Sequence, residues 1–336
     1  MAASIQPASS FDEAGLLLNI ENLTVDFVSR GATTRALSNF NLTLAEGEIV
    51  GMAGESGCGK STAAIAMMGL LPSGARVSGS ILYRNRQLVG LPAAQLREVR
   101  GREIAMVFQE TITALNPVVR VGDQLLRAVR AHAPLTPGEA LDRVTRSLLR
   151  VRLHDTQRVL ASYPSELSGG MCQRVLIAMA IACGSKLLLA DEPTTALDVS
   201  VQREILTLLK DLAAQGIGIL LISHDLAVLS EVASRLVVLY AGEVVEEGPT
   251  HSVIRRPRHP YSRALLACVP RLHGSHSSFV EIPEGRIDAG GGDEGCRFRT
   301  RCGLRAEICE ERPALHTIGA PSQRSRCWRA PELMAD

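Results

Sequence analysis

Hydrophobic and polar residues alternate along two stretches near the start of the chain, residues 16–27 and 37–44. A period of two is typical of a β-strand with one buried face, so both stretches are predicted to be strands. A turn at Gly47 then leads into the apolar run 49–53, which predicts a third strand. Further strand candidates are the short segments 80–83 and 104–108.

In the middle of the chain, apolar residues recur every three to four positions, the spacing of a helix with one buried face. Residues 121–132 and 137–153 follow this pattern, and they predict an inserted helical subdomain over about residues 110–180. Residues 170–182 are apolar nearly all round, which predicts a helix buried on every side.

The second half of the chain alternates between predicted strands and predicted helices. Apolar runs at 186–191, 217–223 and 236–240 are separated by helical patterns at 199–214 and 226–233. Such alternation predicts a parallel sheet with crossover helices. The chain therefore belongs to the α/β class, with a parallel-sheet core and an antiparallel β flank formed by the N-terminal strands.

Composition changes near residue 271. The stretch 271–295 is rich in Gly, Ser and His and contains three consecutive glycines, which is typical of a linker. Four cysteines follow within a short segment. We therefore expect a large domain over residues 16–270, followed by a linker and a Cys-rich extension over residues 271–336.

Charge and hydropathy exclude some classes of function. The 36 Lys and Arg residues nearly balance the 35 Asp and Glu residues, giving a net charge of +1, so the composition predicts no nucleic-acid partner. Residues 1–16 lack the basic and apolar stretches of a signal peptide. The longest apolar run, 175–183, is far shorter than the roughly 20 residues of a membrane helix. We expect a cytosolic protein that reaches a membrane only through partners.

Residues 54–61 read Gly-Glu-Ser-Gly-Cys-Gly-Lys-Ser and fit the pattern GxxxxGK followed by Ser or Thr. Glycines let successive backbone N–H groups converge on phosphate oxygens, and a helix predicted over residues 60–70 adds its positive N-terminus. Lys60 is expected to reach the β- and γ-phosphates, and Ser61 to bind Mg²⁺. The alternative is a chance Gly-rich turn, which the strand before the motif and the helix after it disfavour. The predicted ATP-binding residues of this loop are Gly54, Glu55, Ser56, Gly57, Cys58, Gly59, Lys60, Ser61 and Thr62.

Two adjacent carboxylates, Asp191 and Glu192, follow the apolar run that starts at residue 186. At the end of a buried strand beside a phosphate loop, Asp191 can hold Mg²⁺ directly or through water. Glu192 is then placed to polarise the water that attacks the γ-phosphate. The alternative for Glu192 is an ordinary surface acid or a charge at the start of a helix.

Between these motifs lies the string Leu167-Ser168-Gly169-Gly170-Met171, with Gln109 before it and His224 after it. In this order, over residues 16 to about 270, the chain resembles the ATP-binding subunits of ABC transporters. The resemblance implies an ABC-type ATPase fold with a helical signature subdomain. It also implies that Gln109 contacts the metal and the lytic water, and that His224 binds the γ-phosphate.

Ser168, Gly169 and Gly170 open a predicted helix, so their N–H groups form a second anion site in a chain whose Lys60 already supplies one. The resemblance implies that this signature binds the ATP of a second, related ATPase subunit in a head-to-tail dimer, with Asp198 at the contact. It also implies an aromatic platform for adenine. Phe27 is our candidate, with a core position as the alternative.

The cysteines of the extension carry a separate prediction. Four soft ligands in a reducing compartment suit Zn²⁺ or an iron–sulfur cluster, and the spacing alone separates neither from reduced thiols. The segment and the preceding residues 259–266 resemble the C-terminal region of oligopeptide/dipeptide-type importer ATPases, which implies a 4Fe–4S cluster. Because the extension lies far in sequence from the phosphate loop, we expect a structural or docking role. The ligands would be Cys296, Cys302, Cys309 and Cys327.

The motifs together predict an ATPase that powers import of peptides or related small solutes. The resemblance implies two transmembrane permease subunits, a second ATPase subunit, an extracytoplasmic solute-binding protein, and a peripheral location on the cytoplasmic face of the cell membrane. A soluble ABC ATPase of DNA repair or translation is the main alternative, disfavoured because the chain has one phosphate loop, one signature and no heptads. A metal-sensing subunit with a vestigial ATPase is disfavoured because Lys60, Asp191 and Glu192 are all present.

Overall fold

The computed structural model describes residues 15–29, 32–109, 114–195, 197–268, 295–318 and 323–334. The predicted linker lies almost wholly outside these ranges. An antiparallel sheet in the order β2-β1-β4-β5 forms the predicted flank on the N-terminal side. Leu18 in its middle pairs with Leu44 on one side and Tyr83 on the other. Its strands are β1 (Leu16–Ser29), β2 (Ala32–Ala45), β4 (Ala75–Tyr83) and β5 (Arg86–Gln87).

The second sheet runs in the order β11-β12-β10-β9-β3-β8-β7-β6. From β9 to β6 neighbouring strands are parallel, as predicted, with β3 between β8 and β9. These strands are β3 (Ile49–Ala53), β6 (Ile104–Val107), β7 (Leu187–Asp191), β8 (Gly218–Ile222) and β9 (Arg235–Tyr240).

The other edge of this sheet is antiparallel, so the prediction of a purely parallel core is wrong there. It consists of β10 (Glu243–Pro249), β12 (Gln323–Ser325) and β11 (His316–Ile318). β10 carries three glutamates, and its pattern gives no strand signal. These side chains are nevertheless buried with partners from distant segments: Arg297 and Arg312 pair with Glu243, and Arg324 pairs with Glu247. Glu246 accepts hydrogen bonds from the backbone N–H groups of Arg258 and His259 and from the Gln323 side chain.

Side chains alternate between the two faces of β3 and so join two hydrophobic clusters. Val50 and Met52 pack toward the antiparallel flank, while Ile49 and Ala53 pack toward the helices. A strand buried on both faces is held in place by packing on each side, so the loop that leaves its carboxyl end starts from a rigid position. The helices around the sheets are α1 (Lys60–Met67), α2 (Ala93–Val99), α8 (Val199–Ala214), α9 (Leu226–Val232), α10 (Thr250–Arg255) and α11 (Pro260–Ala267).

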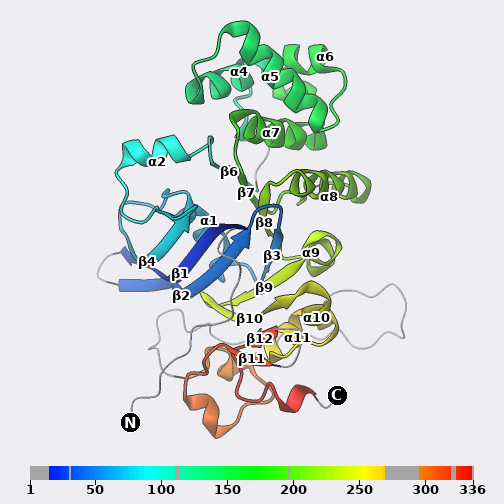
Figure 1. Ribbon diagram of the computed structural model, residues 1–336. Helices are drawn as coiled ribbons and strands as arrows, with labels where there is room; N and C mark the ends of the chain where they lie inside the picture. The colour runs from blue at the N-terminus through cyan, green and yellow to red at the C-terminus, as the bar shows by residue number, and fades with distance from the viewer. Residues whose placement is uncertain are drawn as a thin grey trace.

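A helical subdomain stands at one end of the molecule, and the C-terminal extension lies at the other (Figure 1). The start of α5 is fixed by a capping box between Thr136 and Glu139, with Pro137 in the first turn. Within the described residues, no helix has the length and apolar character that crossing a membrane requires. The subdomain comprises α4 (Val121–His132), α5 (Pro137–Arg150), α6 (Thr156–Ala161) and α7 (Gly169–Cys183).

Candidate functional site

The phosphate loop joins the carboxyl end of β3 to the N-terminus of α1. Two of its glycines are required by close backbone contacts. At Gly54 (φ +152°) a Cβ atom would lie 2.3 Å from the Leu239 carbonyl oxygen, and at Gly59 (φ +108°) it would lie 2.6 Å from the Ala36 carbonyl oxygen. The loop therefore curls tightly between the two sheets, and its N–H groups come together at the start of the helix.

Lys60 is buried, and its ammonium group lies inside the loop. Nζ donates to the carbonyl oxygens of Gly54 (2.7 Å) and Glu55 (2.8 Å). The Cys58 sulfur is 3.8 Å from the same nitrogen. The ammonium group is thus poised at the centre of the loop, where it can exchange these carbonyls for stronger, charged acceptors.

Asp191 ends β7 next to the start of α1, and its carboxyl group is buried and hydrogen-bonded to the Ser61 side chain. Burial raises the pKa of this carboxyl above its usual range, while the Ser61 hydrogen bond and the charge of Lys60 oppose the shift. The structure thus brings Lys60, Ser61 and Asp191 together. A hydroxyl and a carboxylate at one point are oxygen donors of the kind that Mg²⁺ prefers.

Glu192 lies at the centre of a polar cluster assembled from three separate loops. Its Oε2 accepts hydrogen bonds from Gln109 Nε2 (3.1 Å) and Thr195 Oγ1 (3.0 Å), and its Oε1 lies 3.1 Å from His224 Nδ1. Gln109 is 83 positions away in sequence. The structure therefore brings together the three residues that the sequence nominated for catalysis.

The backbone at Glu192 has φ +48°, in the left-handed region that non-glycine residues seldom occupy. Its N–H donates to the Ile222 carbonyl of the neighbouring strand β8 (2.9 Å), and Pro193 follows directly. This strained turn directs the Glu192 side chain away from the end of β7 and toward His224. The Glu192 side chain is only 15% exposed there. Strain of this kind is typical of sites where a side chain must hold one orientation.

Ser168 caps the N-terminus of α7, since its Oγ accepts the Met171 N–H (3.3 Å). Ser168 and Gly169 are exposed, whereas Gly170 packs so closely on Val201 that a Cβ would lie 2.4 Å from a methyl carbon. Among the described residues, no hydrogen bond joins this helix start to the phosphate loop. The two anion sites of the chain are thus separate.

The two remaining predicted nucleotide contacts lie at the periphery. Asp198 is exposed at the start of α8, and Ala196, two positions before it, lies outside the described residues. Phe27 is half-buried on β1, where it pairs with Thr34 on β2 and with Ala75 on β4. Thr34 is two residues from Ala36, whose carbonyl oxygen lies close to Gly59 of the phosphate loop.

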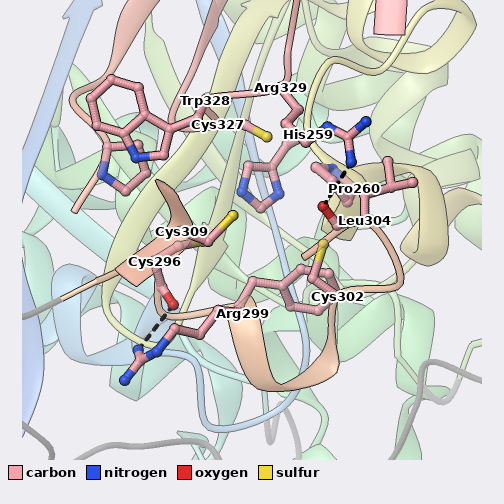
Figure 2. Close-up of a pocket in the computed structure, with 12 residues that line it drawn as sticks. His259, Pro260, Cys296, Arg299, Cys302, Leu304, Cys309, Cys327, Trp328 and Arg329 are labelled. Atoms are coloured by element: carbon pink, nitrogen blue, oxygen red, sulfur yellow. Dashed lines mark hydrogen bonds between the residues drawn. The ribbon is translucent and has the colours of Figure 1, made fainter. Parts of the chain in front are cut away.

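All four cysteines of the extension line one pocket, together with His259, Phe298 and Trp328 (Figure 2). Burial raises the pKa of Cys296 and of Cys327 to about 11, so the free thiols are protonated. Across the described residues, no group of three or more His, Cys, Asp or Glu side chains is arranged to hold a metal ion. The four thiols as placed therefore show neither the predicted 4Fe–4S cluster nor the zinc alternative.

Three residues around the nucleotide site escaped the sequence analysis. Thr195 supports Glu192, while Tyr261 and Arg301 both bind Glu55 of the phosphate loop. None of the three carries a motif from which its role follows. The extension lies far from the loop in sequence but meets it in space, since Arg301 is 246 positions from Glu55 and contacts it.

Comparison with protein families gives two matches. A model described as "ABC transporter" matches residues 37–195, and one described as "Oligopeptide/dipeptide transporter, C-terminal region" matches residues 245–309. The first range holds the phosphate loop, the signature and the two carboxylates. The second begins inside β10 and includes three of the four pocket cysteines.

Among curated relatives, the chain is 42% identical to the probable peptide ABC transporter ATP-binding protein y4tR of Sinorhizobium fredii, over 96% of this chain and 97% of that protein. It is 40% identical to the oligopeptide transport ATP-binding protein OppD of Salmonella typhimurium, over 95% of each chain. Among solved structures, a dimer of the ATP-binding cassette MJ0796 in a post-hydrolysis state, bound to ADP and Pi, matches with a TM-score of 0.62 and 30% identity. That match covers 70% of this chain and 99% of the other.

Proposed function

The chain belongs to the ABC transporter family as an ATP-binding subunit, and from this premise we propose that it hydrolyses ATP to power the import of peptides through a membrane complex. The observation that carries the proposal is the cluster around Glu192, where Gln109, Thr195 and His224 converge on one carboxylate beside the phosphate loop. A soluble role in DNA repair or translation is not favoured, because the chain matches curated relatives named as peptide-transport ATP-binding proteins over nearly their whole length.

We assign the chemistry of hydrolysis as follows. The phosphate loop and Lys60 hold the triphosphate, and Lys60 gives up the Gly54 and Glu55 carbonyls for phosphate oxygens. Ser61 and Asp191 would hold Mg²⁺, which would neutralise charge on the phosphate oxygens. Glu192 accepts a hydrogen bond from the attacking water and takes up its proton, while Gln109 and His224 orient the water and the γ-phosphate.

The site is open on one side in the isolated chain, because the His224 side chain at its mouth is 60% exposed. We propose that Ser168 and the N-terminus of α7 supply the missing donors to the ATP of a facing ATPase subunit, with Asp198 at the contact. The dimeric state of the MJ0796 structures supports this arrangement. Phe27, which is half-buried on β1, is the proposed platform for adenine.

The remaining partners follow from the kind of transporter. Two permease subunits would bind this ATPase and its second copy or paralogue at the cytoplasmic face of the membrane, and a solute-binding protein would deliver the cargo. The names of the relatives, which include a dipeptide transport ATP-binding protein of Bacillus subtilis, support peptides as the transported class.

This function predicts a particular response of the assembled complex. The full chain is reconstituted in vesicles with its permeases, partner ATPase and binding protein. A peptide cargo is then expected to stimulate ATP hydrolysis and to accumulate in the compartment that contains the ATPase subunits and the nucleotide. The measurement pairs phosphate release with uptake of labelled peptide. Hydrolysis that no small peptide stimulates, with DNA or ribosomes stimulating it instead, would reassign the chain to the soluble class.

We further propose that Cys296, Cys302, Cys309 and Cys327 hold a 4Fe–4S cluster. Their convergence on one mostly apolar pocket supports it, since a cluster is larger than a single ion and its four thiolate ligands stand farther apart. The cluster would supply iron–sulfur bonds that cross-link four positions of an extension with little core of its own.

His259 provides an independent test of whether this pocket suits such a group. It is buried in the pocket wall, and its Nδ1 accepts the Tyr261 N–H (3.1 Å), so the proton sits on Nε2. Nε2 has no well-formed hydrogen bond among the described residues, although the Arg326 backbone lies near the ring. Burial lowers the pKa of His259 to about 3, so the ring stays a neutral donor. A sulfur acceptor in the pocket would match this N–H, so the residues present fit the group.

Cys302→Ser is expected to remove this cluster, because one of its four ligands is lost. Protein purified without oxygen should be brown, absorb broadly near ~400 nm and contain roughly four irons per chain, whereas the variant should be colourless. Cys268→Ser is the matched control, because Cys268 is an exposed cysteine outside the pocket. Wild-type protein that contains stoichiometric zinc and no iron, after growth with ample iron, would contradict the proposal.

A further inference from the structure

We propose that Arg301 and Tyr261 are positioning residues for ATP binding, through which the C-terminal region holds the phosphate loop in its nucleotide-accepting shape. The inference goes beyond the proposed function, because it assigns a role in ATP binding to α11 and to the extension, which lie outside the nucleotide-binding motifs. It rests on that function only in requiring that the loop binds ATP. Three sets of contacts carry it.

The first set is a two-bonded ion pair between the extension and the loop. Arg301 Nη1 donates to Glu55 Oε2 (2.9 Å), and Nη2 donates to Oε1 (3.0 Å). The Arg301 side chain is 8% exposed, so water screens this pair poorly. Nη1 also reaches the Tyr240 hydroxyl (3.3 Å), and the guanidinium lies 5.7 Å from the centre of the Tyr240 ring. The arginine is therefore fixed on the core sheet before it meets the loop.

The second set binds the backbone of the same loop residue. The Glu55 N–H donates to the hydroxyl of Tyr261 (2.8 Å), which lies at the start of α11 and is fully buried. The Glu55 carbonyl in turn accepts from Lys60 Nζ. Residue 55 thus has its N–H and its carboxylate held by the C-terminal region and its carbonyl held by Lys60. Because two separate segments hold one loop residue, its conformation is set from outside the motif.

The third set connects these contacts to the cysteine pocket. Arg301 directly precedes Cys302, and Phe298 lines the pocket while packing on Tyr240 (5.2 Å between ring centres) and Tyr261 (5.5 Å). A contiguous layer of aromatic rings therefore runs from the pocket to residue 55. Packed layers of this kind transmit a displacement at one end to the other.

The charge of Glu55 determines whether loss of Arg301 should strengthen or weaken ATP binding. The Glu55 carboxylate lies in a loop that must accept a triphosphate, and an unpaired negative charge there would repel the ligand. Arg301 neutralises that charge and holds it to one side. Loss of Arg301 should therefore weaken MgATP binding, raising KM far more than it changes kcat, since Glu192 and its partners are untouched.

The experiment titrates MgATP onto the purified full chain carrying Arg301→Gln. We expect affinity to fall about tenfold, within the range typical of coupling between two sites. Adding Glu55→Gln to this variant should restore most of the affinity, because the repelling charge is then gone. Arg305→Gln is the matched control: Arg305 pairs with Glu310 (2.6 Å) in the same extension, is exposed, and is expected to leave affinity unchanged.

If the extension affects ATP binding, then ATP binding must also affect the extension. This reverse effect can be measured, and a general loss of stability would not change it. MgATP should slow hydrogen exchange in residues 295–318 of the wild-type chain and should not do so in Arg301→Gln. If that variant folds poorly, Arg301→Lys keeps the charge, loses the two-bonded geometry and should give an intermediate affinity. Lys60→Ala, which removes the phosphate ligand itself, shows whether the titration reports ATP binding at all.

Two results would overturn the proposal. One is wild-type affinity in a folded Arg301→Gln variant, and the other is a loss of affinity that Glu55→Gln does not reverse. A wild-type chain that binds no MgATP would instead contradict the proposed function, and the two failures are therefore distinguishable.

Discussion

Glu192→Gln is expected to slow ATP hydrolysis by the complete transporter by about 10²- to 10⁴-fold, the usual contribution of a positioned general base. Glutamine keeps the shape of the side chain and its bonds from Gln109 and Thr195, but its amide cannot take a proton from water. MgATP affinity should change little, because Lys60 and the phosphate loop are intact. ATP should then hold the two ATPase subunits together.

The measurement is phosphate release by the reconstituted complex, with trapped nucleotide counted after rapid filtration. Glu98→Gln is the control, because it removes a carboxylate on α2 that is 69% exposed and remote from the loop. Turnover at the wild-type rate in Glu192→Gln would remove Glu192 from the mechanism, and the base would have to be sought elsewhere in the site.

Ser168→Arg is expected to abolish hydrolysis at the site that borrows this signature, a loss of about 10²-fold or more, as for other preorganised donors to a reacting anion. The same variant should bind MgATP normally as an isolated subunit. The reason is structural: Ser168 is exposed at the start of α7, and no hydrogen bond within the described residues joins it to the phosphate loop.

Affinity of the isolated subunit and turnover of the assembled complex are therefore measured side by side. Ser73→Arg, an equal change at an exposed turn before β4, controls for the added charge. If the isolated Ser168→Arg subunit failed to bind ATP, the signature would serve the nucleotide of its own chain, and the composite site between two subunits would be wrong.

Local sequence determined most of the ATPase core, because its signals are short-range. The period of the apolar residues marked β1, α4 and α8 within a few positions of their observed ends. The phosphate loop needs glycine where a Cβ would clash with a neighbouring strand, so the spacing of its glycines can be recognised in the sequence. Asp191 and Glu192 followed from their place at the end of an apolar strand.

The edge of the core sheet could not be predicted in this way. The local sequence of β10 is that of a charged segment, and its burial as a strand depends on distant partners such as Arg297 and Arg312, which neutralise Glu243 from more than fifty positions away. Burial of a charged residue depends on its partner, and the partner is supplied by the fold. No local pattern contains that information.

Within the site too, local sequence predicted the residues of the motifs but not their contacts with distant segments. Glu192 was nominated by its own neighbours in sequence, but its orientation depends on a left-handed turn and on Gln109 and Thr195. Glu55 was predicted only as an ATP-binding residue of the loop, and nothing in its local sequence indicated the ion pair with Arg301. The sequence by itself determined which reaction the chain is suited to, since the motifs for ATP hydrolysis consist of residue types at fixed spacing. Only the tertiary structure decided that the C-terminal extension meets the phosphate loop, because contacts between distant segments arise when the whole core packs.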